Sequence, residues 1–187
     1  MKKLFLFSML FITVTIVNAQ VKFGIKSGMN ISDIAGAEEK DDYRIKTGFH
    51  VGAFANVPLT SSLSIQPEVF YSMQGARWDD DNEKTSLNYL QVPLLAKYKT
   101  PAGFFVVAGP QVGFLLKAED NNEGEIEDVK QYLKKTDVSF VVGAGYHVFR
   151  GAAVNVRYNA GLVKFYEDER NSFFQVGMSY TFGSRSK

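Results

Sequence analysis

Eight segments of about ten residues, in which apolar side chains alternate with polar or small ones, dominate this sequence. Such alternation places the two kinds of side chain on opposite faces of a β-strand. The 16 glycines and the 14% aromatic content also favour strands and tight turns over helices. The segments are residues 21–31, 47–57, 63–74, 87–99, 104–116, 138–148, 154–162 and 174–182. The pattern predicts an all-β chain.

The connections between these segments alternate in length. Three are short, at residues 58–62, 100–103 and 149–151. Four are longer and charged, at residues 32–46, 75–86, 117–137 and 163–171. Short turns on one rim and long loops on the other are typical of outer-membrane barrels, with the turns in the periplasm. An even number of strands also returns both termini to the periplasmic rim.

The two faces of the predicted strands differ in charge. One face of every strand is almost free of charged residues, whereas the other combines glycine with groups such as Lys26, Glu68 and Arg157. Aromatic residues cluster at both ends of the apolar face, as in the aromatic girdles of bilayer barrels. We therefore expect an eight-stranded antiparallel up-and-down transmembrane β-barrel with short periplasmic turns and long extracellular loops. The alternative is a secreted soluble barrel with its apolar face inside.

The N-terminal residues have the pattern of a secretory signal peptide. Lys2 and Lys3 precede an apolar stretch at residues 4–17, and Val17-Asn18-Ala19 forms a small-residue cleavage site. The apolar stretch is shorter than the roughly 20 residues of a membrane helix. We predict a signal peptide at residues 1–19, rather than a buried N-terminal helix, with cleavage between Ala19 and Gln20. Residues 20–187 would then form the exported barrel domain.

Composition excludes several classes of function. The 21 Lys and Arg residues nearly balance the 20 Asp and Glu residues, so the chain lacks the excess of positive charge that is typical of nucleic-acid-binding proteins. The absence of cysteine excludes disulfides, thiolate metal sites, cysteine nucleophiles and lipid attachment through Cys.

Several motifs resemble those of the Bacteroidetes-type outer-membrane β-barrel family, whose members are often labelled porin-family proteins. They are FGIKSGMN at 23–30, QPEVFYS at 66–72, LQVPLLAKY at 90–98, AGPQVG at 108–113, GAGY at 143–146 and VGMSYTF at 176–182. The resemblance implies the barrel fold and an outer-membrane location, but the label does not establish conduction. Two features depart from the family: Gln91 stands where members often carry Glu, and residues 183–187 follow the aromatic Phe182.

Lys26, Glu68 and Arg157 are expected at one depth inside the barrel, each about five residues from the periplasmic rim. The lumen of an eight-stranded barrel is narrow enough for side chains to fill. We therefore predict a structural polar network that plugs the lumen, with hydrogen bonds from Gln91, Gln111 and Gln175. The alternative interpretation is a charged constriction in a pore.

A catalytic interpretation depends on the register of two strands. Folding them about Thr60 sets His50 opposite Phe70, with Ser72 and Glu68 as diagonal neighbours. His, Ser and Glu within such reach have the composition of an acyl-transfer triad, but no oxyanion donors can be identified. His147 is expected near the opposite rim from His50, which gives no support for a metal site. We expect no enzyme activity, cofactor or metal.

The long loops carry the remaining charge. Residues 79–83 have the composition of a calcium loop without its spacing, and residues 117–137 contain seven acids and four lysines. Solvated loops are expected, with divalent-ion bridges to surface lipid phosphates as the alternative.

The sequence thus predicts a structural or surface-interaction protein of the outer membrane. Its expected partners are outer-membrane lipid, lipopolysaccharide and other envelope proteins or extracellular ligands. A small-solute or ion channel, a membrane acyl-transfer enzyme and a component of a secretion or gliding apparatus are the alternatives.

Overall fold

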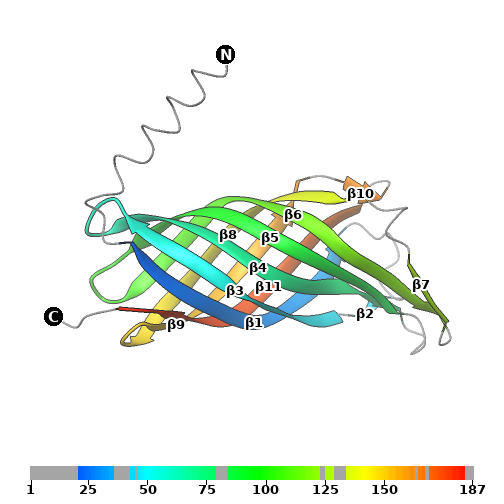
Figure 1. Cartoon of the computed structure of the whole chain (residues 1–187), viewed down its shortest axis with the longest axis horizontal. Helices are drawn as coiled ribbons and strands as arrows, with labels where there is room; N and C mark the ends of the chain where they lie inside the picture. The colour runs from blue at the N-terminus through cyan, green and yellow to red at the C-terminus, as the bar shows by residue number, and fades with distance from the viewer. Residues whose placement is uncertain are drawn as a thin grey trace, which may run out of the picture.

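The computed structural model describes residues 21–35, 43–44, 46–78, 84–122, 125–128, 134–162, 164–166 and 169–183. Within these ranges the chain forms a closed antiparallel barrel (Figure 1). No helix in the described ranges is both long and apolar enough to cross a membrane. The predicted signal peptide and the acidic run at 79–83 lie outside the described residues.

Eight long strands make the wall. They are β1 (Lys22–Ala35), β3 (Lys46–Pro58), β4 (Leu63–Trp78), β5 (Lys84–Lys99), β6 (Phe104–Asn122), β8 (Thr136–Phe149), β9 (Ala152–Gly161) and β11 (Glu169–Thr181). Each pairs with its neighbours in chain order, and β1 pairs with β11 to close the ring. Three short strands, β2 (Tyr43–Arg44), β7 (Glu125–Asp128) and β10 (Lys164–Tyr166), pair with β4, β6 and β11. The predicted fold class is confirmed.

The short turns, the start of β1 and the end of β11 lie together at one end of the barrel (Figure 1). Residues 59–62, 100–103 and 150–151 connect β3 to β4, β5 to β6 and β8 to β9. Gly103 and Gly151 have φ values of 93° and 76°, a backbone region that L side chains rarely adopt. The sequence analysis predicts that this end faces the periplasm, and we call it the periplasmic rim.

At the outer end the strands are longer than the sequence pattern indicated. The predicted loop at 117–137 contains the end of β6, which reaches Asn122, and all of β7, which pairs with it. Strands β1 and β4 likewise continue into predicted loops, to Ala35 and Trp78. The alternation of apolar residues ends before these strands do, because backbone hydrogen bonding continues regardless of side-chain polarity. A pattern of hydrophobicity therefore marks the membrane-facing part of a strand only.

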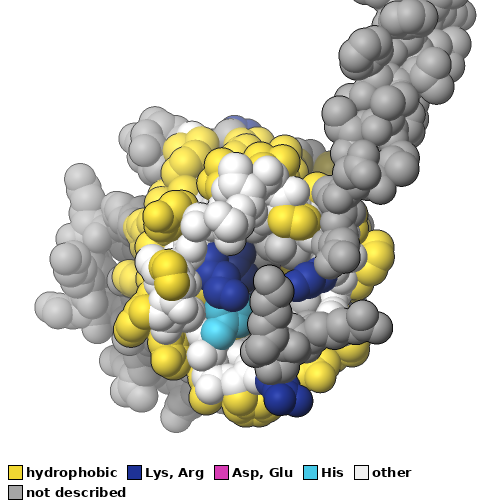
Figure 2. All heavy atoms as spheres, turned by 90° about the vertical axis from the view of Figure 1, so that its left-hand side faces the viewer, with side chains coloured by type: hydrophobic (Ala, Val, Ile, Leu, Met, Phe, Trp, Pro, Cys, Tyr) yellow, Lys and Arg dark blue, Asp and Glu magenta, His cyan; other side chains and the backbone are white. Residues whose placement is uncertain are grey.

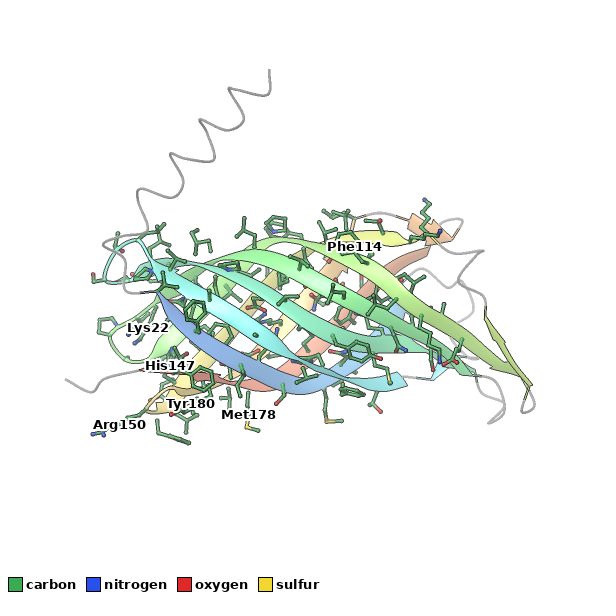
Figure 3. All side chains as sticks on the ribbon, in the orientation of Figure 1. Lys22, Phe114, His147, Arg150, Met178 and Tyr180 are labelled. Atoms are coloured by element: carbon green, nitrogen blue, oxygen red, sulfur yellow. The ribbon has the colours of Figure 1, made fainter. Side chains whose placement is uncertain are left out.

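The predicted assignment of side chains to the two faces is confirmed on all eight strands. Apolar residues of the uncharged rows point outward, and Figure 3 shows Phe114 and Met178 directed away from the wall. The exposed fractions of Phe23, Phe104 and Met178 are 64%, 61% and 65%, which suits contact with lipid. Outward aromatic pairs lie towards both ends: Phe104–Tyr146 and Tyr180–Phe182 near the turns, Phe49–Tyr71 and Tyr158–Phe174 nearer the loops.

The lumen is filled mainly by polar side chains. Its buried polar residues include Lys26, Asn30, His50, Glu68, Gln91, Gln111, Arg157 and Gln175. Two apolar clusters accompany them, one around Leu95 and Phe105 and one around Leu87 and Tyr89. At the seam between β1 and β11, Gly28 faces Gly177. A Cβ on Gly28 would lie 2.7 Å from His50 Cε1, so this glycine makes room for the histidine ring.

Candidate functional site

The carboxylate of Glu68 lies buried in the lumen between two cations. Lys26 Nζ lies 2.9 Å from Glu68 Oε2, and Arg157 donates through Nη1 to Oε2 at 2.8 Å and through Nη2 to Oε1 at 2.9 Å. All three residues are at most 4% exposed. The structure thus brings together the three inward charges that the sequence places at one depth.

The Arg157–Glu68 pair spans the barrel. In the ring order β1-β3-β4-β5-β6-β8-β9-β11, strand β4, which carries Glu68, is four strands away from β9, which carries Arg157. Four strands is half of the ring, so these side chains meet from opposite walls. The two parallel hydrogen bonds make this a bidentate arginine–carboxylate pair, which is stronger than a single hydrogen bond. The pair therefore links β4 and β9 directly across the interior of the barrel.

The amide that supports Glu68 is Gln66, which the sequence analysis did not include in the network. Gln66 Nε2 donates to Glu68 Oε1 at 2.8 Å, and Lys26 Nζ lies 4.0 Å from the centre of the Phe70 ring. The sequence signal that could have identified Gln66 was its spacing of two from Glu68, because residues 66, 68 and 70 share the inner face of β4. Buried charges are stabilising only when their remaining hydrogen-bonding capacity is satisfied, and here both carboxylate oxygens have partners.

The three glutamines predicted to support the cluster have other hydrogen-bond partners or none, whereas Glu68 is bonded to Lys26, Gln66 and Arg157. Gln175 Nε2 donates to Asn30 Oδ1 at 3.0 Å, and Gln111 Nε2 donates to Ser139 Oγ at 3.0 Å. Gln91 is fully buried, and neither polar atom of its amide has a hydrogen-bond partner among the described residues. Gln175 lies opposite Arg157 in the pairing of β11 with β9, yet its amide donates to Asn30, so register alone did not determine the hydrogen-bond partner.

A second polar layer forms around Asn30. Its Oδ1 lies 2.9 Å from His50 Nδ1, and its Nδ2 donates to Ser72 Oγ at 2.9 Å and to the carbonyl of Met73 at 2.7 Å. Gln74 Nε2 also donates to Ser72 Oγ, at 2.9 Å. These contacts join β1, β3 and β4 and add a second filled level to the lumen.

The register expected for His50 is wrong by two residues. His50 lies opposite Ser72, and Gly52 lies opposite Phe70, because the turn after Pro58 is centred one residue later than Thr60. The observed partners also differ from those of a triad. His50 is hydrogen-bonded to Asn30, Ser72 to Asn30 and Gln74, and Glu68 to Lys26, Gln66 and Arg157.

The periplasmic end of the lumen opens into a cavity of about 260 Å³. Its basic lining consists of Lys22, Lys97, Lys99 and the imidazole of His147. Figure 2 looks into this end and shows Lys or Arg side chains beside a histidine in the opening, and Figure 3 places Lys22 and His147 there. Among the described residues, no three His, Asp or Glu side chains gather in a way that could hold a metal ion.

Comparison with known proteins agrees with this geometry. The family model described as "Outer membrane protein beta-barrel domain" matches residues 18–167. Ail, the attachment invasion locus protein of Yersinia pestis, has a similar structure, with 13% identity and a TM-score of 0.53 over 87% of this chain and 97% of that one. Neisserial surface protein A gives the same values. No curated protein matches the sequence. The chain belongs to the outer membrane β-barrel domain family and is a protein of the outer membrane.

Proposed function

We propose that this protein is a closed outer-membrane barrel whose lumen is plugged by the Glu68 cluster and which acts without catalysis, through its outer surface. The single observation that carries the proposal is the Arg157–Glu68 pair, whose members come from opposite walls of the barrel. A conducting pore needs a continuous path of water through the lumen. Here the ion pair and the Asn30 layer occupy two successive levels of that lumen.

The outer end supports a role in surface structure or interaction. Strand β6 continues to Asn122, and the pairing of β7 with it extends the ordered wall beyond the apolar band. The ion pair between Lys117 and Glu119 is partly exposed at this end. Exposed, charged elements on a rigid scaffold are where binding functions usually lie. We therefore place the contacts with lipopolysaccharide, envelope proteins or extracellular ligands at the outer end and those with membrane lipid on the apolar wall.

Two further observations bear on the family branch and on ligand binding. The motifs at 66–72 and 90–98 favour membership in the Bacteroidetes-type branch of the family. Ail has also been solved in complex with the heparin analogue sucrose octasulfate, so a barrel of this fold is compatible with ligand binding. The ligand of the present chain would be selected by its own loops.

Conductance in planar bilayers tests the plug directly. Wild-type protein is expected to give no steady conductance. The double variant Glu68→Ala/Arg157→Ala, which removes the ion pair across the lumen, is expected to give at least brief openings if it still forms a barrel. The variant Lys117→Ala changes only an exposed outer charge and serves as the control. Steady conductance by the wild type would overturn the plugged-lumen proposal in favour of a channel.

A further inference from the structure

The cavity at the periplasmic rim has an unusual charge composition. Among the described residues that line it are three lysines and a histidine, together with hydroxyl and amide side chains, and there is no carboxylate. Figure 2 shows the basic groups around the opening of the barrel. Clefts lined by one sign of charge and walled by protein focus the electrostatic potential and attract counter-ions. This composition favours an anion.

Lys97 is the buried member of this group. It is only 8% exposed, and its Nζ lies 4.0 Å from the centre of the Phe105 ring. His147 packs on the same ring, with 5.2 Å between ring centres. The described residues provide Lys97 with no ion pair, and a cation–π contact offsets only part of the cost of burying a charge.

Lys26 is a second buried lysine over an aromatic ring, and unlike Lys97 it has an ion-pair partner. Its Nζ also lies 4.0 Å from the centre of an aromatic ring, that of Phe70, but a carboxylate oxygen of Glu68 lies 2.9 Å away. Lys97 repeats the lysine-over-ring arrangement closer to the rim without the carboxylate. The comparison indicates that the anion for Lys97 comes from outside the described barrel.

The charge balance of the lumen also indicates that Lys97 lacks a carboxylate partner among the described residues. Near the periplasmic end, Glu68 is the one buried carboxylate among the described residues, and it is already shared by Lys26 and Arg157. Asp137, also buried, lies at the far end of the lumen opposite Gly113. With Lys97 included, three buried cations face one carboxylate, in a region where low dielectric strengthens electrostatic attraction.

We propose that this cavity is a binding site for a phosphate group, with Lys97 as its principal cation and Lys22 and Lys99 at its rim. The volume of about 260 Å³ is several times the roughly 30 Å³ that a water molecule occupies. A phosphate monoester carries about −1.5 to −2 charges and three acceptor oxygens, so it can engage several lysines and the hydroxyls of Ser64 and Thr181 together. A single carboxylate would leave more of these donors unused.

Two sources of this chemistry are available at the rim, namely free phosphate in the periplasm and the phosphate of a lipid headgroup in the adjacent leaflet. The site faces away from the outer loops, so it does not depend on the proposed outer-surface role. It also lies on the periplasmic side of the Glu68 cluster, so it requires no conduction through the barrel.

Titration calorimetry on the purified protein in neutral detergent micelles at low salt tests the proposal. The probes are inorganic phosphate and, in a second series, dihexanoyl phosphatidic acid. For the probe that binds, Lys97→Met is expected to weaken the affinity at least tenfold, and Lys97→Arg is expected to retain it within about threefold. The control Lys117→Met removes the same charge from the outer end and should leave the affinity within twofold.

Binding of inorganic phosphate with this dependence on Lys97 identifies a site for the free anion. Binding of the lipid phosphate alone, with the same dependence, identifies a headgroup site. Lys22→Met, at the partly exposed rim, provides a second test if Lys97→Met does not fold, and should weaken binding at least threefold. Absence of binding by both probes overturns the proposal, and so does equal affinity of the wild type and the folded lysine variants.

Discussion

Arg157 and Glu68 face each other from opposite walls of the barrel and form two parallel hydrogen bonds of 2.8 and 2.9 Å in its interior. Lys26 approaches the same carboxylate from a third strand, β1. The three residues therefore tie together parts of the wall that share no backbone hydrogen bonds. In a barrel whose outer face is lipid-exposed, such a cluster takes the place that a hydrophobic core has in a soluble domain.

Removal of the Glu68 carboxylate is expected to destabilise the barrel clearly. Glu68→Ala leaves Lys26 and Arg157 buried without their anion, and breaking a buried pair from one side typically costs about 3–5 kcal/mol. Glu68→Gln keeps the shape and one acceptor, so it should cost less. The free energy of unfolding in urea, measured in detergent micelles, gives both values. An unchanged midpoint for Glu68→Ala would mean that the lumen is wetter than proposed.

The matched control for this experiment is Gln111→Ala. Gln111 is as deeply buried as Glu68, but its side chain makes a neutral hydrogen bond to Ser139. A neutral hydrogen bond contributes about 0.5–1.5 kcal/mol, so this variant should lose less stability than Glu68→Ala. Equal losses in the two variants would show that the effect comes from side-chain volume and not from charge.

The coupling between the two opposed residues is measurable in a double-mutant cycle. Arg157→Met, Glu68→Gln and the combined variant are compared by unfolding in urea. Because the two side chains share two charge-assisted hydrogen bonds, their interaction energy should fall within the usual range for contacting residues, about 0.5–3 kcal/mol. The pair Lys117 and Glu119, at the exposed outer end, should show less than about 1 kcal/mol. Additive effects at Glu68 and Arg157 would contradict the direct pairing.

The alternating pattern was sufficient to predict the eight strands, their inward faces and the meeting of Lys26, Glu68 and Arg157. These features depend on a period of two and on distance from a common rim, both of which can be counted along the sequence. The partner of His50 could not be predicted in the same way, because moving the centre of the turn after Pro58 by one residue shifts the pairing by two. The role of Gln66 was missed because it depends on a side-chain contact within β4. The outer ends of β1, β4 and β6 were missed because the alternation of apolar residues does not extend to them.

The glycine pair at the closing seam is expected to tolerate no side chain. A Cβ on Gly28 would lie 2.5 Å from Gly177 Cα and 2.7 Å from His50 Cε1. Gly28→Ala should therefore destabilise the barrel by about 1–3 kcal/mol, as overpacking usually does. The adjacent, outward-facing Ser27 provides the control, since Ser27→Ala enlarges nothing inside the lumen. Wild-type stability of Gly28→Ala would show that the seam between β1 and β11 is looser than described.

Processing at the N-terminus is a separate expectation from the sequence. The small residues at Val17-Asn18-Ala19 should direct cleavage after Ala19, which makes Gln20 the first residue of the membrane-inserted protein. The intact mass of protein extracted from outer membranes measures this directly. Ala19→Leu, which removes the small residue at the cleavage site, should leave the uncleaved precursor. Retention of residues 1–19 in the wild-type membrane protein would contradict the predicted signal peptide.

Protease added to intact cells tests which end of the barrel faces outward. The longest and most charged connection, residues 117–137, should be cut, whereas the short turn at residues 100–103 should be spared. Within that connection, β6 up to Asn122 and β7 should resist cleavage, because paired backbone fits poorly into a protease active site. Mass spectrometry of the fragments locates the cuts, and permeabilised cells provide the control in which both rims are accessible. Cleavage at 100–103 with an intact 117–137 segment would reverse the orientation, and it would move the basic cavity around Lys97 to the cell exterior.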